Sequence, residues 1–232
     1  MKPATPTAGF VETTLEGNRR GPNAARREAT REKLLNASVD CLYKHGYWGA
    51  STVLVTQVAG VSRGSLLHQF PTKADLMLAT AQHIALMRGK AHRDGLAGVP
   101  RKDRLPLLVD ILWGEVTSPS GIARIEIMLA ARSDQELAAI YMPFHAAQEQ
   151  RQREAIWDLA QALGARRRHV VDAVTQLYTA SLRGLSIDHI YPHSREGVLG
   201  AVALLKRVMV AEIEREIAHG QSMDPEQAEA AG

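Results

Sequence analysis

The chain has 232 residues, of which 45% are hydrophobic and 23% are charged, and this balance excludes a wholly disordered or fibrous protein. The only cysteine, Cys41, excludes a framework of intramolecular disulfides and favours a reducing compartment. We expect a cytoplasmic protein, because the start of the chain lacks the apolar core of a signal peptide and no charge-free stretch is apolar enough to cross a membrane.

The positive charge is concentrated in one segment, although the formal net charge of the whole chain is only +3. Residues 19–75 contain nine Lys and Arg against four Asp and Glu, a net of +5, whereas residues 76–232 carry a net charge of −1. This asymmetry indicates a polyanionic partner near the N-terminal end. A solvated basic helix would produce the same pattern.

The first elements in chain order are an arm and a helix. Residues 1–22 are rich in Pro, Gly and Thr without an apolar period, so we expect a disordered basic arm. An apolar face with helical spacing predicts a helix from Asn23 to about His45, which Gly46 ends. Cys41 lies on the apolar face and is expected to be a small core residue.

Two short helices joined by a tight turn are predicted next. Ser51 is placed to cap the first helix, and Gly60 ends it. Ser62 caps the second, which runs over Arg63–Phe70 and stops before Pro71. This arrangement is typical of a helix-turn-helix, whose second helix enters the major groove of DNA.

The rest of the chain also shows helical periodicity and no long alternating strand pattern. Further helices are expected at residues 72–93, 102–117, 119–131, 133–163, 165–187 and 195–218. The predicted fold class is therefore all-α with about nine helices. The expected domains are a DNA-binding domain at 23–75, a ligand-binding and dimerisation domain at 76–219, and a flexible tail at 220–232.

The segment around the turn resembles the TetR family of bacterial transcription regulators. Residues 55–76 read VTQVAGVSRGSLLHQFPTKADL, and they follow a Gly46-Tyr47 turn and the Ser51-Thr52 pair. The resemblance covers about residues 25–80 and implies an N-terminal helix-turn-helix domain followed by a larger helical domain for ligand binding and dimerisation. One departure is Leu67, where the family usually has a tyrosine that contacts the DNA backbone.

The resemblance also implies which side chains contact DNA. Arg63, Gly64, Ser65 and His68 would face the major groove, where the Arg63 guanidinium is suited to guanine. Thr52, Gln69 and Lys73 would contact phosphates. The full implied set is Ser51, Thr52, Ser62, Arg63, Gly64, Ser65, Leu67, His68, Gln69 and Lys73. In the basic arm, the side chains of Arg19, Arg20, Arg26 and Arg27 would either reach DNA or remain solvated.

The helices at 165–187 and 195–218 have apolar surfaces too wide for a single buried face. By the resemblance, the second face covers a partner subunit in a four-helix bundle. The alternative is a fully buried core within one chain. A homodimer would bind a palindromic DNA operator.

The resemblance implies a small-molecule effector bound among the middle helices. Candidate ligand-binding residues combine aromatic, Met and a few polar side chains, as pockets do. They are Trp113, Met128, Arg132, Tyr141, His145, Trp157 and Tyr178. Each of them would also fit an ordinary core. Arg132 would either meet an acidic ligand or pair with Asp134 or Glu136.

We therefore predict a DNA-binding transcriptional repressor that a small molecule releases from its operator. No catalytic residues, cofactor or metal site are expected, because the sequence lacks phosphate-binding, nucleophile-elbow and zinc-binding motifs. The alternatives are an all-helical enzyme, a small-molecule binding protein and a nonspecific DNA-binding protein. Competitor DNA would separate the last of these from a sequence-specific regulator.

Overall fold

The computed structural model describes residues 22–222, and within this range the chain is all-α, as predicted. Its helices are α1 (Pro22–Gly49), α2 (Thr52–Ala59), α3 (Arg63–Gln69), α4 (Lys73–Gly95), α5 (Arg104–Val116), α6 (Pro119–Ala130), α7 (Gln135–Leu163), α8 (Arg168–Asp188) and α9 (Arg195–Ser222). Two short 3-10 helices, η1 (Arg101–Asp103) and η2 (Pro192–Ser194), precede α5 and α9. In the described part of the chain, no helix is long and apolar enough to span a membrane.

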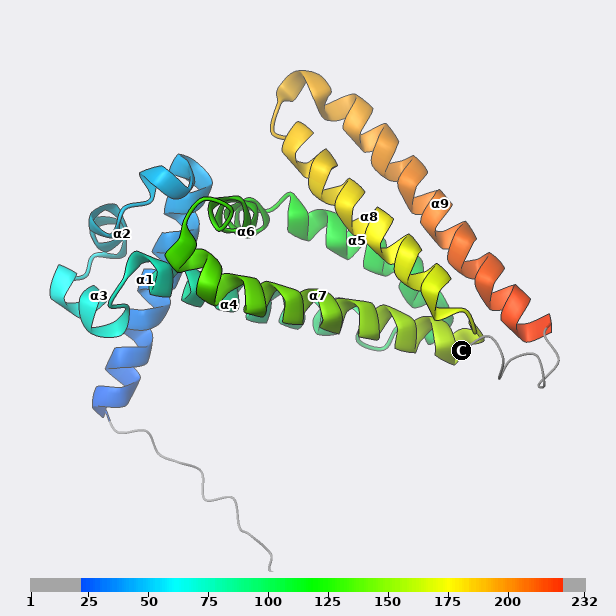
Figure 1. The fold of residues 1–232 in the computed structure, drawn as a ribbon, viewed down its shortest axis with the longest axis horizontal. Helices are drawn as coiled ribbons and strands as arrows, with labels where there is room; N and C mark the ends of the chain where they lie inside the picture. Colours follow the sequence, from blue (N-terminus) through cyan, green and yellow to red (C-terminus); the bar gives the residue numbers. More distant parts are fainter. Residues whose placement is uncertain (1–21, 223–232) are drawn as a thin grey trace, which may run out of the picture.

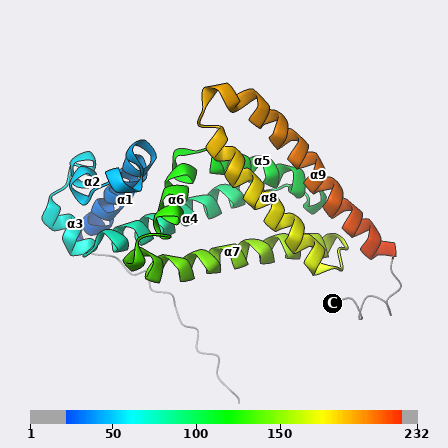
Figure 2. The same ribbon diagram turned by 45° about the horizontal axis from the view of Figure 1, so that its top comes forward.

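The molecule divides into a head, made of α1–α3, and a body, made of α4–α9. Helix α4 leaves the head and runs beside α7 through the body (Figure 1). Helices α8 and α9 pack against each other as an antiparallel pair on the far side of the body, and both views show this pair standing at the edge of the molecule (Figure 2). The head and the α8–α9 pair therefore lie at opposite ends.

The local signals around the turn act as the sequence predicts. The Ser51 hydroxyl accepts a hydrogen bond from the Leu54 amide at 3.1 Å and caps α2, which ends at Gly60 in a left-handed conformation with φ +65°. The Ser62 hydroxyl accepts from the Ser65 amide at 3.1 Å and caps α3. The helix-turn-helix prediction is confirmed.

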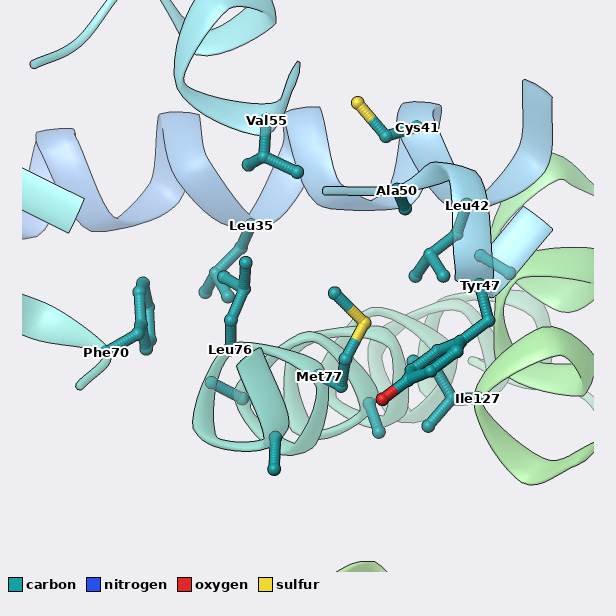
Figure 3. Packing of buried hydrophobic residues seen from close by; sticks show 14 of the residues in the cluster. Leu35, Cys41, Leu42, Tyr47, Ala50, Val55, Phe70, Leu76, Met77 and Ile127 are labelled. Atoms are coloured by element: carbon teal, nitrogen blue, oxygen red, sulfur yellow. The ribbon is translucent and has the colours of Figure 1, made fainter. Parts of the chain in front are cut away.

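The core of the head extends into the body. Leu42 of α1, Met77 of α4 and Ile127 of α6 meet around the ring of Tyr47 in one buried cluster (Figure 3). Cys41 also belongs to this cluster and is free and buried, which confirms it as a core residue. The head is therefore held against α6 and the start of α7.

A second buried cluster joins α5, α7, α8 and α9. Near its far end α9 runs to Ser222, so the prediction of a flexible tail from Gly220 is wrong for its first residues. Gly220 is buried there because α9 approaches the backbone of Gly164, and a Cβ at Gly220 would lie 2.1 Å from the Gly164 carbonyl oxygen. The remainder of the predicted tail, 223–232, lies outside the described residues.

Glu216 anchors this end of α9 to the segment between α7 and α8. It is 1% exposed and accepts hydrogen bonds from the Arg167 amide at 2.8 Å and the Arg167 Nη2 at 2.6 Å. Burial raises the pKa of Glu216, but hydrogen bonds from Arg167 and Arg166 outweigh burial, and the pKa lies below the usual 4.5. The charged carboxylate is thus the stabilised form.

Glu216→Gln is expected to lower the free energy of unfolding by about 1.5–3 kcal/mol, because it removes charge-assisted hydrogen bonds from a buried site. Because the folded pKa is depressed, the stabilisation is complete above the unfolded pKa and declines as pH falls through the folded value. Urea unfolding at pH 7 and pH 4 measures both effects. Glu214→Gln, at an exposed position of the same helix, is the matched control. Equal stability of the two variants at pH 7 would contradict the assignment.

Candidate DNA-binding surface and ligand cavity

The recognition helix α3 has one face in the core and one face in solvent. Leu66 and Phe70 are buried in the first core cluster and fix the orientation of the helix. Arg63, Gly64 and His68 are exposed on the opposite face. The structure therefore presents the polar side chains that the sequence assigns to the major groove on one accessible surface.

The hydroxyl groups and Leu67 on this surface have different surroundings. The Ser62 and Ser65 hydroxyls lie 2.9 Å apart within the cap of α3, and Ser65 is half-buried. Leu67 is 44% exposed, so it offers an apolar group where the family usually has tyrosine. Near the start of α2, Ser51 is exposed and Thr52 is half-buried.

Lys73 and Gln69 are predicted to contact phosphate, but the Lys73 side chain has partners within the protein and the Gln69 side chain is partly buried. The Lys73 ammonium donates a hydrogen bond to the Tyr47 carbonyl oxygen at 2.7 Å and lies 4.1 Å from the centre of the Tyr47 ring. Burial lowers the pKa of Lys73. Gln69 is half-buried, and its Oε1 is buried without a partner among the described residues. Contact of Lys73 or Gln69 with phosphate remains a prediction.

The basic arm is only partly described. Arg26 and Arg27 are exposed in the first turns of α1, whereas Arg19 and Arg20 lie outside the described residues. Because α1 packs against α2 and α3, Arg26 and Arg27 lie on the head. Their contact with DNA therefore remains a prediction.

Tyr47 joins the head to two helices of the body. Its amide donates to Glu126 Oε2 at 3.0 Å on α6, and its hydroxyl donates to Asp134 Oδ2 at 2.5 Å. Asp134 in turn caps α7 by accepting from the Leu137 amide at 3.0 Å. Gly46, with φ +66°, makes the turn that brings the Tyr47 amide to Glu126. A displacement of α6 or α7 therefore acts directly on the head.

The body contains a cavity of about 630 Å³ between α4, α5, α6, α7 and α8, within the range of small-molecule sites. Of the seven predicted ligand-binding residues, Tyr141 and His145 line this cavity. Trp113, Met128, Arg132, Trp157 and Tyr178 do not line it.

The other five residues have ordinary structural surroundings outside the cavity lining, and their contact with a ligand stays an untested prediction. Tyr178 is buried in the second core cluster and donates to the Val109 carbonyl oxygen at 3.3 Å. Trp113 and Trp157 pack against the same cluster, and Met128 packs against the first. Arg132 is exposed at the end of α6. Aromatic and Met side chains at helical spacing serve the core here, because large apolar surfaces are needed there as much as in a pocket.

The charged side chains that line the cavity were not among the predicted ligand-binding residues. Its lining contains six arginines and one glutamate. Burial, followed by repulsion from Arg88, lowers the pKa of Arg124 on α6 to about 10. The guanidinium therefore remains charged at neutral pH. The available signal was an arginine flanked by apolar residues in Ile122–Ile125.

Behind the lining, Glu115 on α5 holds two α4 side chains. Its carboxylate oxygens lie 2.9 Å from Arg88 Nε and 2.8 Å from His92 Nε2. Burial raises the pKa of Glu115, but His92 and Arg88 lower it further, and the net direction is downward. The carboxylate is thus shared between the Arg88 and His92 side chains of α4, and its charge also acts on Arg124.

Known proteins resemble the chain most closely in the head. Residues 34–80 match the family model of bacterial regulatory proteins of the tetR family. An uncharacterized HTH-type transcriptional regulator of Mycobacterium tuberculosis is 35% identical over 113 residues, which are 48% of this chain and 58% of that protein. The HTH-type transcriptional repressor AcnR of Corynebacterium diphtheriae is 31% identical over 99 residues, covering 39% of this chain and 52% of AcnR. The chain spans a little over half the length of these curated relatives.

The fold as a whole has counterparts among solved structures. A transcriptional regulator of Rhodococcus sp. Rha1 superposes with a TM-score of 0.64 at 19% identity, over 84% of this chain and 99% of that one. The capped helix-turn-helix, the match over residues 34–80 and this common helical fold agree with one another. Residues 34–80 are a helix-turn-helix domain of the TetR family of bacterial regulatory proteins, and the chain as a whole shares the helical fold of the Rhodococcus regulator.

Proposed function

We propose that this chain is a transcriptional repressor that binds a palindromic operator as a homodimer and leaves it when a small molecule occupies the body. The observation that carries the proposal is the course of α4. This helix begins four residues after α3, and its second half lines the cavity through Ala85, Arg88 and His92. One rigid element thus touches both the DNA-binding head and the ligand cavity.

The homodimer is supported by the outer surface of α8 and α9. Four of its large apolar side chains are about half exposed or more in the single chain: Leu177, Leu199, Leu204 and Val208. The alternative of a fully buried monomer core does not fit this exposure. Large apolar side chains exposed on an outer helix pair favour an association site, and a twofold axis would bring the same helices of a second copy against them.

Release by a ligand requires that the ligand bind the DNA-incompetent arrangement better than the competent one. A tenfold preference corresponds to about 1.4 kcal/mol per subunit. The half-sites of such operators lie roughly 34–36 Å apart, so a displacement of α4 and Tyr47 by a few ångströms would spoil the fit of both heads. The similarity to AcnR, a repressor, supports the sign of regulation.

Selection of binding sites from a random duplex pool tests the proposed function. We expect the full-length chain to enrich an inverted repeat whose halves have the spacing of one turn of DNA. Unrelated competitor DNA should not displace the enriched site at equal concentration. Recovery of no common sequence, with equal affinity for all duplexes, would instead favour the nonspecific DNA-binding protein and contradict the proposal.

A further inference from the structure

The lining of the cavity carries an excess of positive charge, which Glu115 behind it offsets at Arg88. Its only acidic lining residue, Glu149, lies 3.8 Å from Arg183 Nη2 and 3.8 Å from His145 Nδ1. The other five lining arginines have no acidic partner in the lining itself. A cavity of this composition attracts anions and disfavours cations.

Two guanidinium groups in the cavity lining have unused donors. The side chain of Arg124 forms no hydrogen bond and no ion pair within residues 22–222. Arg183 Nε is buried and has no hydrogen-bond partner in the same range. Arg124 also experiences repulsion from both Arg88 and Arg183, which places the three guanidinium groups near one another. A buried donor such as Arg183 Nε is costly without a partner, and an anion that accepts from it would remove that cost.

The cavity wall also has a large apolar part. Leu108 and Leu112 of α5, Ile156 and Leu159 of α7, and Leu182 of α8 line it. Apolar side chains of this kind favour a hydrocarbon or aromatic body. The wall therefore combines cationic side chains, among them Arg124 of α6 and Arg183 of α8, with an apolar surface from α5, α7 and α8.

We propose that the cavity binds an amphipathic carboxylic acid, whose carboxylate accepts hydrogen bonds from Arg124 and Arg183 and whose apolar body lies against α5, α7 and α8. The inference rests on the proposed function in so far as this cavity is the effector site. A carboxylate presents two oxygens to a guanidinium and forms short, charge-assisted hydrogen bonds with it. An amide of the same acid lacks the charge, and an amine of the same length adds a like charge beside three arginines.

Calorimetric titration of the full-length protein with matched compounds tests this assignment. The probes are decanoate with decanamide and decylamine, and 1-naphthoate with 1-naphthamide, so that a linear and an aromatic body are both represented. We expect at least one acid to bind with a dissociation constant at least tenfold lower than its amide, and the amine to bind more weakly than the amide. Equal binding within each set, tighter binding of the amine, or no binding of any probe would overturn the proposal.

Arg124→Met tests the role of the guanidinium with little change in volume. We expect the preference for acid over amide to disappear and the melting temperature of the unliganded protein to be unchanged or higher, because an unpaired buried charge is removed. Arg93→Met, at an exposed lining position, is the matched control and should retain the preference within about threefold. An acid preference that survives in Arg124→Met would overturn the role of Arg124.

These titrations contain no DNA, so they are independent of the operator. If acids bind but do not release the protein from the selected operator, the proposed release by ligand is contradicted and the proposed ligand class is still supported. If operator binding is sequence-specific but no acid preference is found, the ligand class fails while the proposed repressor stands.

Discussion

Arg63→Ala is expected to lower operator affinity by about 1–3 kcal/mol per half-site, or roughly 5- to 150-fold, and to relax the preference at one base pair. Arg63 is exposed at the first position of α3, and the buried Leu66 prevents the helix from turning to offer another side chain. The Arg63 guanidinium donates no hydrogen bond to another side chain or backbone group within residues 22–222, so its donors are free for guanine. Binding measurements on the selected operator and on single-base variants of it give both quantities.

Lys73→Ala provides the contrast, because Lys73 donates to the Tyr47 carbonyl oxygen and sits beside the head rather than on its outer face. We expect this change to weaken binding to all duplexes alike and to reduce the salt dependence if the ammonium also contacts phosphate. A loss of affinity with unchanged salt dependence would assign Lys73 to support of the Tyr47 turn. The same change of base preference in Arg63→Ala and Lys73→Ala would show that the separation of roles is wrong.

Leu204→Glu is expected to convert the dimer into a monomer near 25.4 kDa and to lower operator affinity about 100-fold or more. Leu204 is 53% exposed on the outer face of α9, and a carboxylate there would have to be buried opposite its own symmetry copy. The loss of affinity follows because two linked heads bind two half-sites far more tightly than one head binds one. Light scattering at micromolar concentration and operator titration measure the two effects.

Leu86→Glu is the control for this change, since Leu86 is even more exposed, at 75%, but lies on α4 away from the α8–α9 surface. It should remain dimeric and keep its operator affinity within about threefold. A wild-type protein that is already monomeric, or a Leu204→Glu variant that remains dimeric, would place the interface elsewhere.

The sequence predicted the head well because its signals are local. Ser51, Gly60 and Ser62 each determine the conformation of the backbone within three or four residues, and the structure places them at the predicted caps and turn. Tyr141 and His145, which were predicted to bind a ligand, line the cavity, and their contact with a ligand stays a prediction. Arg124 was missed because its importance depends on arginines that α4 and α8 bring beside it, and no local pattern reports such a meeting.

The boundaries of the domains were harder to predict from the sequence for the same reason: they depend on contacts between distant segments. The predicted boundary after residue 75 lies near the start of α4. In the structure, Ala123 and Ile127 of α6 belong to the same core cluster as Leu34 and Leu42 of α1. Only the tertiary packing reveals that α6 belongs with the head. Similarly, residues 220–232 were predicted to be a tail because they are rich in Gln, Glu and Ala without an apolar core, whereas Gly220 is buried in contact with Gly164.

The shared core also limits how this regulator can be recombined with others. A chimera that exchanges residues 22–75 alone would cut through the cluster around Tyr47 and leave α6 facing foreign side chains. An exchange that also carries α6 and the first turns of α7 keeps Glu126 and Asp134 with their Tyr47 partner. The natural unit for engineering a new operator specificity onto this body is therefore discontinuous in sequence: α1 to the first half of α4, followed by α6 and the start of α7.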